Sequence, residues 1–275
     1  MSDSLPYRNI ALFILMFLFS LMAKSQEEEV DPAKAAQNPL ANVYSLPLQY
    51  NTDFGIGDYS KTSNTLNIQP VIPVVLGESG WLLINRAIIP FPQTVPDIFT
   101  ESGGSTTGLG DISYTAWFAP PSKGNLTWGI GPVTILPTAT SSELGNGKFS
   151  IGPSLVFVYV VPTFMGAAVI SNWKSVGGDK DRSDVHTFFF QYILTYFLQN
   201  KWYLSSAPLN LANWEAEKDQ RWIIPVGGGV GKMFKIGNLP VDLQTQVFYN
   251  VVRPDLAAQW QWRVQFKLIF PKGKK

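Results

Sequence analysis

The sequence contains no cysteine, a single histidine and few charged residues. Without cysteine, the chain has neither a disulfide framework nor a lipid anchor on an N-terminal cysteine. One histidine, His186, excludes a metal site built from several histidines, and we expect no metal and no other cofactor. Charged residues make up 15% of the chain, against about 25% in ordinary globular domains, and hydrophobic residues make up 45%. The surface is therefore not that of an ordinary water-soluble domain.

Long apolar runs are also missing beyond the first 25 residues, which excludes a bundle of transmembrane helices. The apolar segment Leu155–Ile170 comes nearest, but it is rich in valine and contains Pro162 near its middle. Proline breaks a helix and β-branched residues favour strands, so we predict two strands joined at Val161–Thr163. From residue 26 onward, 19 Lys and Arg balance 19 Asp and Glu. Such a balance gives no reason to expect a nucleic-acid partner.

The first 25 residues have the pattern of a secretory signal. A polar start with Arg8 precedes the apolar run Ile10–Met22, and Ala23 and Ser25 are the small residues that a signal peptidase recognises. A retained anchor helix is the alternative, but about 13 apolar residues are fewer than the ~20 that span a bilayer. We therefore predict that residues 1–25 are a cleaved signal peptide.

The C-terminal segment alternates with a period of two. One face carries Trp260, Trp262, Val264, Phe266, Leu268 and Phe270, and the other carries Gln261, Arg263, Gln265 and Lys267. A soluble antiparallel sheet alternates too, but buries its apolar face in a shared core. Large apolar residues on one face and charges on the other are typical of a strand between lipid and a wet interior.

The same pattern predicts twelve strands in total, each long enough for a tilted strand to cross a bilayer. They are 43–52, 65–76, 81–91, 108–119, 126–138, 149–160, 164–174, 185–198, 201–214, 221–235, 240–252 and 259–270. Ten or fourteen strands would result if a boundary were wrong. Nine prolines fall inside these strands, where each removes a ladder hydrogen bond, so we expect either bulged walls or strands that end early.

The connections between these strands alternate between long and short. The long ones are 53–64, 92–107, 139–148, 175–184, 215–220 and 253–258, and the short ones are 77–80, 120–125, 161–163, 199–200 and 236–239. Outer-membrane barrels have an even number of strands, short periplasmic turns and longer extracellular loops. The sequence thus predicts an all-β fold: a transmembrane, antiparallel, up-and-down β-barrel spanning residues 43–275, after a periplasmic lead-in or plug at residues 26–42.

All nine tryptophans lie near predicted strand ends, as expected of the aromatic belts at the two membrane interfaces. Large aromatics that only filled a core would also occur in mid-strand. The order of the strands assigns Trp81, Trp117, Trp128 and Trp202 to the periplasmic rim, and Trp173, Trp214, Trp222, Trp260 and Trp262 to the outer rim.

The chain resembles the MetA-pathway phenol-degradation family of bacterial outer-membrane transporters. The segments that carry this resemblance are Asn67–Pro73, Trp81–Pro90, Thr107–Trp117, Gly131–Thr138 and Trp202–Pro254. It covers nearly the whole chain after the signal peptide. It implies a barrel in the bacterial outer membrane and a transport function, and it carries over no substrate and no binding residue.

Polar residues on the predicted interior face are the candidates for function. An unpaired charge facing lipid costs ~2–4 kcal/mol at the midplane, so these side chains should point inward. The candidate lumen-lining residues are Asn67, Gln69, Arg86, Asp111, Asp242, Gln244, Arg263 and Lys267. They would either line a selective pore or pair with one another and close a narrow barrel.

Two motifs that suggest enzymes are weak. His186 lies near Ser171, Ser183 and Asp184, but no motif supports a Ser-His hydrolase on the barrel wall. The run Gly227–Lys232 fails the phosphate-loop pattern at both ends, and its glycines fit close packing in a strand better.

We therefore expect a non-enzymatic channel that lets small solutes, including aromatic or hydrophobic ones, cross the outer membrane passively. The alternatives are a closed structural or surface-interaction barrel and, remotely, a lipid hydrolase. Its expected partners are outer-membrane lipid, the barrel-assembly machinery and the solute.

Overall fold

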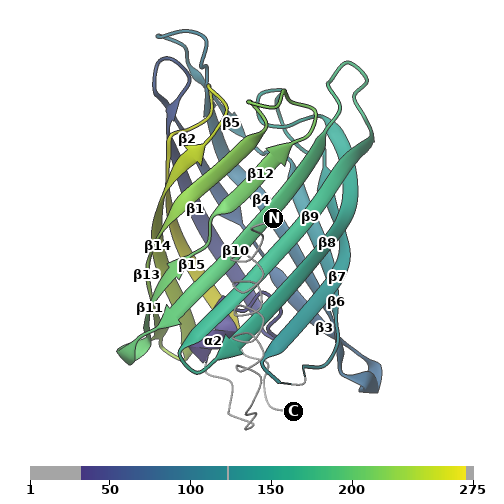
Figure 1. Cartoon of the computed structure of the whole chain (residues 1–275), viewed down its shortest axis with the longest axis vertical. Helices are drawn as coiled ribbons and strands as arrows, with labels where there is room; N and C mark the ends of the chain where they lie inside the picture. The colour runs from purple at the N-terminus through teal and green to yellow at the C-terminus, as the bar shows by residue number, and fades with distance from the viewer. Residues whose placement is uncertain (1–31, 123, 271–275) are drawn as a thin grey trace, which may run out of the picture.

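The computed structural model describes residues 32–122 and 124–270; the predicted signal peptide lies outside them. One sheet curls into a closed antiparallel barrel, in which β9 pairs with β10 to complete the ring (Figure 1). The strands are β1 (Tyr44–Ile56), β2 (Lys61–Ile68), β3 (Val71–Leu76), β4 (Trp81–Pro96), β5 (Ser105–Gly108), β6 (Ile112–Ala119), β7 (Leu126–Leu136), β8 (Lys148–Val161), β9 (Phe164–Gly178), β10 (His186–Phe197), β11 (Trp202–Ser206), β12 (Leu209–Asn213), β13 (Trp222–Ile236), β14 (Leu239–Val252) and β15 (Trp260–Phe270).

The predicted twelve-stranded barrel is confirmed. The fifteen strands occupy twelve positions around the barrel, because three of these positions are each filled by two consecutive shorter strands. These pairs are β2 with β3, β5 with β6, and β11 with β12. Pro70 and Pro208 lie in two of the three interruptions, and Pro225 lies at a bulge in β13. These three prolines thus lie where the regular ladder is interrupted, as their missing N–H donor favours.

The join predicted inside the apolar segment Leu155–Ile170 is also confirmed. β8 ends at Val161 and β9 begins at Phe164, and the two strands pair over their whole length. Among the described residues, no helix is long and apolar enough to span a membrane.

The first predicted long loop is wrong. β1 continues to Ile56 and β2 already begins at Lys61, so only four residues connect them. The polar side chains of Asp53 and Ser63 concealed these strand ends, although the two residues pair directly across the ladder.

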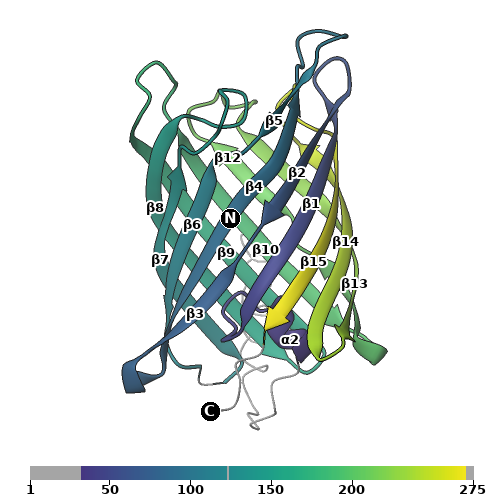
Figure 2. The same cartoon turned by 180° about the vertical axis from the view of Figure 1, so that it is seen from behind.

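One short helix lies inside the barrel. α2 (Pro32–Gln37) sits within one end of the barrel, close to the start of β1 and the end of β15 (Figures 1 and 2). Ala35, Ala36 and Gln37 are buried there, and Leu40 just beyond the helix is buried too. Two 3-10 turns, η1 (Gly77–Ser79) and η2 (Gln199–Lys201), form short connections between strands.

Side chains alternate across the wall as predicted for β14 and β15. Leu243, Val247 and Tyr249 of β14 are exposed on the outside, whereas Asp242, Gln244 and Gln246 between them are buried inside.

This alternation leads to a prediction about stability. Phe266→Arg should lower the free energy of unfolding by ~2–4 kcal/mol, because Phe266 pairs with Leu48 and Leu243 on the lipid face. Gln265→Glu also adds a full charge, but on the inner face, on the same side as Lys267, and should cost below about 1 kcal/mol. Urea titration in lipid vesicles measures both, and equal losses would contradict the assigned faces.

Candidate functional site

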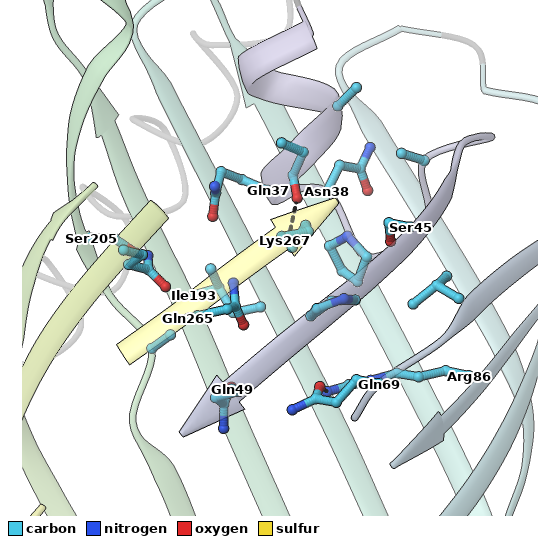
Figure 3. A pocket seen from close by; sticks show the side chains of 18 of the residues that line it. Gln37, Asn38, Ser45, Gln49, Gln69, Arg86, Ile193, Ser205, Gln265 and Lys267 are labelled. Carbon is cyan, nitrogen blue, oxygen red and sulfur yellow. Dashed lines mark hydrogen bonds between the residues drawn. The ribbon is translucent and has the colours of Figure 1, made fainter. Parts of the chain in front are cut away.

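A cavity of about 110 Å³ lies inside the barrel, bounded on one side by α2 (Figure 3). Its lining comes from strands far apart in sequence, which the closed sheet brings around one space. Most of its polar lining consists of amide side chains and three cations: Gln37, Asn38, Gln49, Gln69, Arg86, Gln191, Gln244, Arg263, Gln265 and Lys267.

The three cations, Arg86, Arg263 and Lys267, form what we call the cationic wall. Arg86 Nη2 donates to Gln69 Oε1 at 2.8 Å, and Lys267 Nζ donates to the carbonyl oxygen of Ala36 in α2 (Figure 3). Among residues 32–122 and 124–270, the single ion pair joins Lys148 to Asp184, near the outer loops. The cationic wall therefore has neutral hydrogen-bond acceptors and no direct carboxylate partner.

Arg263 is the most enclosed of the three, with 3% of its surface exposed. Its guanidinium donates to Asn51 Oδ1 at 3.2 Å, Gln261 Oε1 at 2.8 Å and the Ala207 carbonyl at 2.8 Å. Ala207 lies in the interruption between β11 and β12, where the carbonyl lacks a regular ladder partner. Arg263 of β15 thus links β1 to the irregular segment between β11 and β12.

Asp242 holds the end of α2 in place. It is fully buried, and its carboxylate accepts from Tyr203 Oη at 2.7 Å and from Gln37 Nε2 at 3.1 Å. Tyr203 fits inside because its cross-strand partner is Gly231, where a Cβ would lie 2.2 Å from the phenol ring. The expected close packing at the glycine run is confirmed at this position.

Another part of the interior, formed by β4, β6, β8 and β9, is apolar. Its buried residues, which we call the apolar wall, are Ile84, Trp117, Ala119, Val156, Val158, Met165, Ala167 and Val169, joined by Leu40 after α2. Ile193 packs against this wall and also lines the cavity. The cavity is therefore amphipathic: its cations and amides share one small space with the aliphatic side chains of Val71, Val169 and Ile193.

The structure brings most of the sequence candidates together. Gln69, Arg86, Gln244, Arg263 and Lys267 line the cavity. Asp242 does not line the cavity, but it accepts a hydrogen bond from Gln37, which does. Asn67 pairs across the ladder with Gln49, another residue that lines the cavity.

Asp111 lies apart from this group. It lies in the interruption between β5 and β6, and its carboxylate accepts hydrogen bonds from the backbone N–H groups of Ala139 and Asn146, at 3.1 and 2.7 Å. It borders a second space of about 260 Å³ among the outer loops. Its role is to hold a loop, which sequence alternation alone did not reveal.

Seven of the nine tryptophans predicted for the aromatic belts lie on the outside of the barrel or near its outer loops. Trp81, Trp128, Trp202, Trp260 and Trp262 are exposed on the outside of the barrel, and Trp81 packs edge-on against Trp128 at 6.5 Å. Trp214 and Trp222 pack against each other at 5.7 Å near the outer loops.

Two tryptophans were assigned wrongly to the belts. Trp117 is 1% exposed and donates through Nε1 to Ser154 Oγ inside the barrel, at 2.9 Å. Trp173 shares the inner face of β9 with Ser171 and packs on Phe189. Distance from the strand end placed both at a rim, but strand alternation decides which face a side chain occupies.

The hydrogen-bond partner of the His186 side chain is Asn172 and not Ser171. Asn172 Nδ2 lies 3.2 Å from His186 Nε2 and Asn172 Oδ1 accepts from Trp214 Nε1, both away from the interior. Ser171 lies on the opposite face and donates to Ser154 Oγ at 2.8 Å. Ser171 is therefore not placed to act as the nucleophile of a hydrolase that uses His186 as its base.

A larger space of about 660 Å³ lies among the outer loops, lined by Arg182, Asp184, Thr187, Leu211, Asn213 and Arg221 among others. We call this space the vestibule. No sequence pattern predicts it, because most of its lining comes from loops, whose conformations have no periodicity.

No family model matches the chain, and no curated protein matches it. Among solved structures, the COG4313 outer membrane channel from Pseudomonas putida F1 is similar, with a TM-score of 0.64 and 14% identity over 88% of this chain and 100% of that one. The P. putida toluene transporter TodX has a TM-score of 0.42 and 10% identity, over 87% of this chain and 91% of that one. Outer membrane phospholipase A from Escherichia coli has a TM-score of 0.43 and 13% identity, over 82% of this chain and 92% of that one. The first similarity shows the fold: a closed antiparallel barrel like that of a bacterial outer-membrane channel.

Proposed function

We propose that the protein is an outer-membrane channel, without enzymatic activity, for the passive passage of small solutes, including aromatic or hydrophobic ones. The observation that carries this proposal is the amphipathic cavity, which is lined by the cationic wall and by Val71, Val169 and Ile193. A solute with an apolar body and one polar group finds partners for both within such a space. The vestibule among the outer loops offers the route of entry.

The proposal includes the surroundings of the barrel. The exposed apolar side chains of β14 and β15, and the exposed tryptophans, support contact with outer-membrane lipid. Insertion of such a barrel calls for the outer-membrane assembly machinery. Membership of the MetA-pathway family is part of the same proposal, and the barrel fold supports it.

The second candidate is a closed structural barrel. It is favoured by one observation: α2 is fixed by Asp242 and Lys267 across one end of the interior. In that case residues 32–42 would act as a permanent plug, and the outer loops alone would carry function.

A pair of neighbouring residues tests the channel. Ile193 lines the cavity, whereas Leu194 beside it is exposed on the outside of the barrel. Ile193→Trp should narrow the passage and lower the uptake of labelled catechol into proteoliposomes at least threefold. Leu194→Trp adds the same volume to the lipid face and should leave uptake unchanged.

Uptake is corrected for protein-free liposomes, and heat-modifiable migration on gels confirms that both variants fold. If folded wild-type protein gives neither catechol uptake nor single-channel conductance, the closed structural barrel is the better account.

A further inference from the structure

The cationic wall has an excess of positive charge. Arg86, Arg263 and Lys267 are accompanied by two interior carboxylates, Asp53 and Asp242, which interact electrostatically with Arg263 and Lys267 respectively. With all five groups ionised, three cations and two anions leave one positive charge unbalanced. Arg86 contributes most to this excess, because it repels both Arg263 and Lys267 and has no carboxylate partner of its own.

The two carboxylates do not neutralise the cavity by direct contact. Asp53 accepts from Gln261 Nε2 at 2.9 Å, and Asp242 accepts from Tyr203 and Gln37. Neither residue lines the cavity, whereas all three cations do. The cavity is therefore lined by cations and amide groups, whereas the carboxylates of Asp53 and Asp242 hydrogen-bond to residues outside the cationic wall.

Buried charge without a counter-charge is costly, and a guanidinium has five donors in a planar fork that matches a carboxylate. Arg86 donates one side-chain hydrogen bond within the described residues, to Gln69. Gln49 and Gln265 add amide groups around the same space, and Val71, Val169 and Ile193 add aliphatic surface.

We propose that this cavity is a binding site for a compact organic monoanion, whose carboxylate lies against Arg86 and Lys267 and whose apolar body lies against Val169 and Ile193. One negative charge balances the excess charge of the cationic wall. A cavity of ~150 Å³ accommodates benzene. The space here measures about 110 Å³ but is not fully enclosed, so a carboxylate with one aromatic ring fits only by extending through the open side, and this ring sets the upper limit on size. The inference rests on the proposed function and names its preferred class of solute.

Benzoate and benzyl alcohol test this site, because they share a ring and differ in charge. Isothermal titration of the purified full-length barrel at neutral pH should show benzoate binding at least tenfold more tightly than benzyl alcohol. Arg86→Gln should weaken benzoate about tenfold and leave benzyl alcohol unchanged, and Arg86→Lys should recover part of the loss. Lys174→Gln removes a cation from the exposed outer end of β9 and should change neither affinity.

Gln265→Glu supplies an independent check. It places a fixed carboxylate in the lining of the cavity, and so should lower benzoate affinity at least tenfold even if Arg86→Gln fails to fold. Equal affinities for the two ligands, no benzoate binding, or unchanged benzoate binding in Gln265→Glu would each overturn the site. Catechol uptake without a preference for benzoate would reject this inference and keep the channel. Benzoate binding without any uptake or conductance would reject the channel and keep the site.

Discussion

Deleting residues 32–42 should raise single-channel conductance several-fold in a planar bilayer. This segment contains α2, which lines the cavity and covers one end of the interior (Figure 2). Leu40, just after it, packs against the apolar wall. Once the segment is gone, nothing among the remaining described residues holds that position, and water and ions can occupy it. The deletion therefore opens the end of the interior that α2 covers and leaves the strand ladder intact.

The stability of the deletion variant should fall by ~1.5–3 kcal/mol, chiefly because Leu40 no longer packs against the apolar wall. The polar contacts matter less, since Asp242 retains its hydrogen bond with Tyr203 and Lys267 loses only its contact with the Ala36 carbonyl. Water in the opened interior can replace the hydrogen bonds that both groups lose. Gln37→Ala, which removes one hydrogen bond to Asp242 and keeps the helix, is the matched control and should change conductance by less than twofold. Conductance that stays at the wild-type level after the deletion would show that α2 does not limit passage.

The wall of this barrel was predictable because its chemistry repeats every second residue. In β15, polar and large apolar residues alternate from Trp260 to Leu268, so both register and face follow from the sequence. Two of the three interruptions were also predictable, since they contain Pro70 and Pro208. Each proline removes a donor, and the strand divides where the donor would be missing.

The interior was harder to predict, because β8 and β9 are apolar on both faces. Val156 and Val158 point inward and are fully buried, yet in sequence they resemble their lipid-facing neighbours. The apolar wall was therefore missed. Trp117 was predicted wrongly for a different reason. It shares a face of β6 with Ser113 and Thr115, and this alternation indicates the interior more reliably than distance from the strand end indicates a rim.

α2 and the roles of Gln37 and Tyr203 had no usable signal. A six-residue helix is too short for a helical period to be recognised. Its position depends on hydrogen bonds to Asp242 and Lys267, more than 200 residues away in sequence. Only the closed barrel brings these groups together.

Arg263 gives the second large expected effect. Arg263→Gln should lower the free energy of unfolding by ~3–5 kcal/mol, because it removes a buried cation that donates to Asn51, Gln261 and Ala207. The Ala207 carbonyl would keep only its 3.3 Å bond from Gln191, Gln261 Oε1 would lose this donor, and Asp53 would lose the favourable charge of Arg263. Arg263→Lys keeps the charge but not the planar fork, so it should recover only part of the stability.

Ion selectivity, measured on the same variants, shows what else Arg263 does. If the cationic wall sets the potential of a conducting interior, Arg263→Gln should also reduce the permeability of chloride relative to potassium, seen as a shift in reversal potential under a salt gradient. Unfolding in urea and bilayer recordings together separate the two effects. A large loss of stability with unchanged selectivity would mean that Arg263 only closes the wall at Ala207, and would favour the structural barrel over the channel. A change in selectivity that Arg263→Lys restores would mean that the charge itself acts on passing ions, which a purely structural role does not explain.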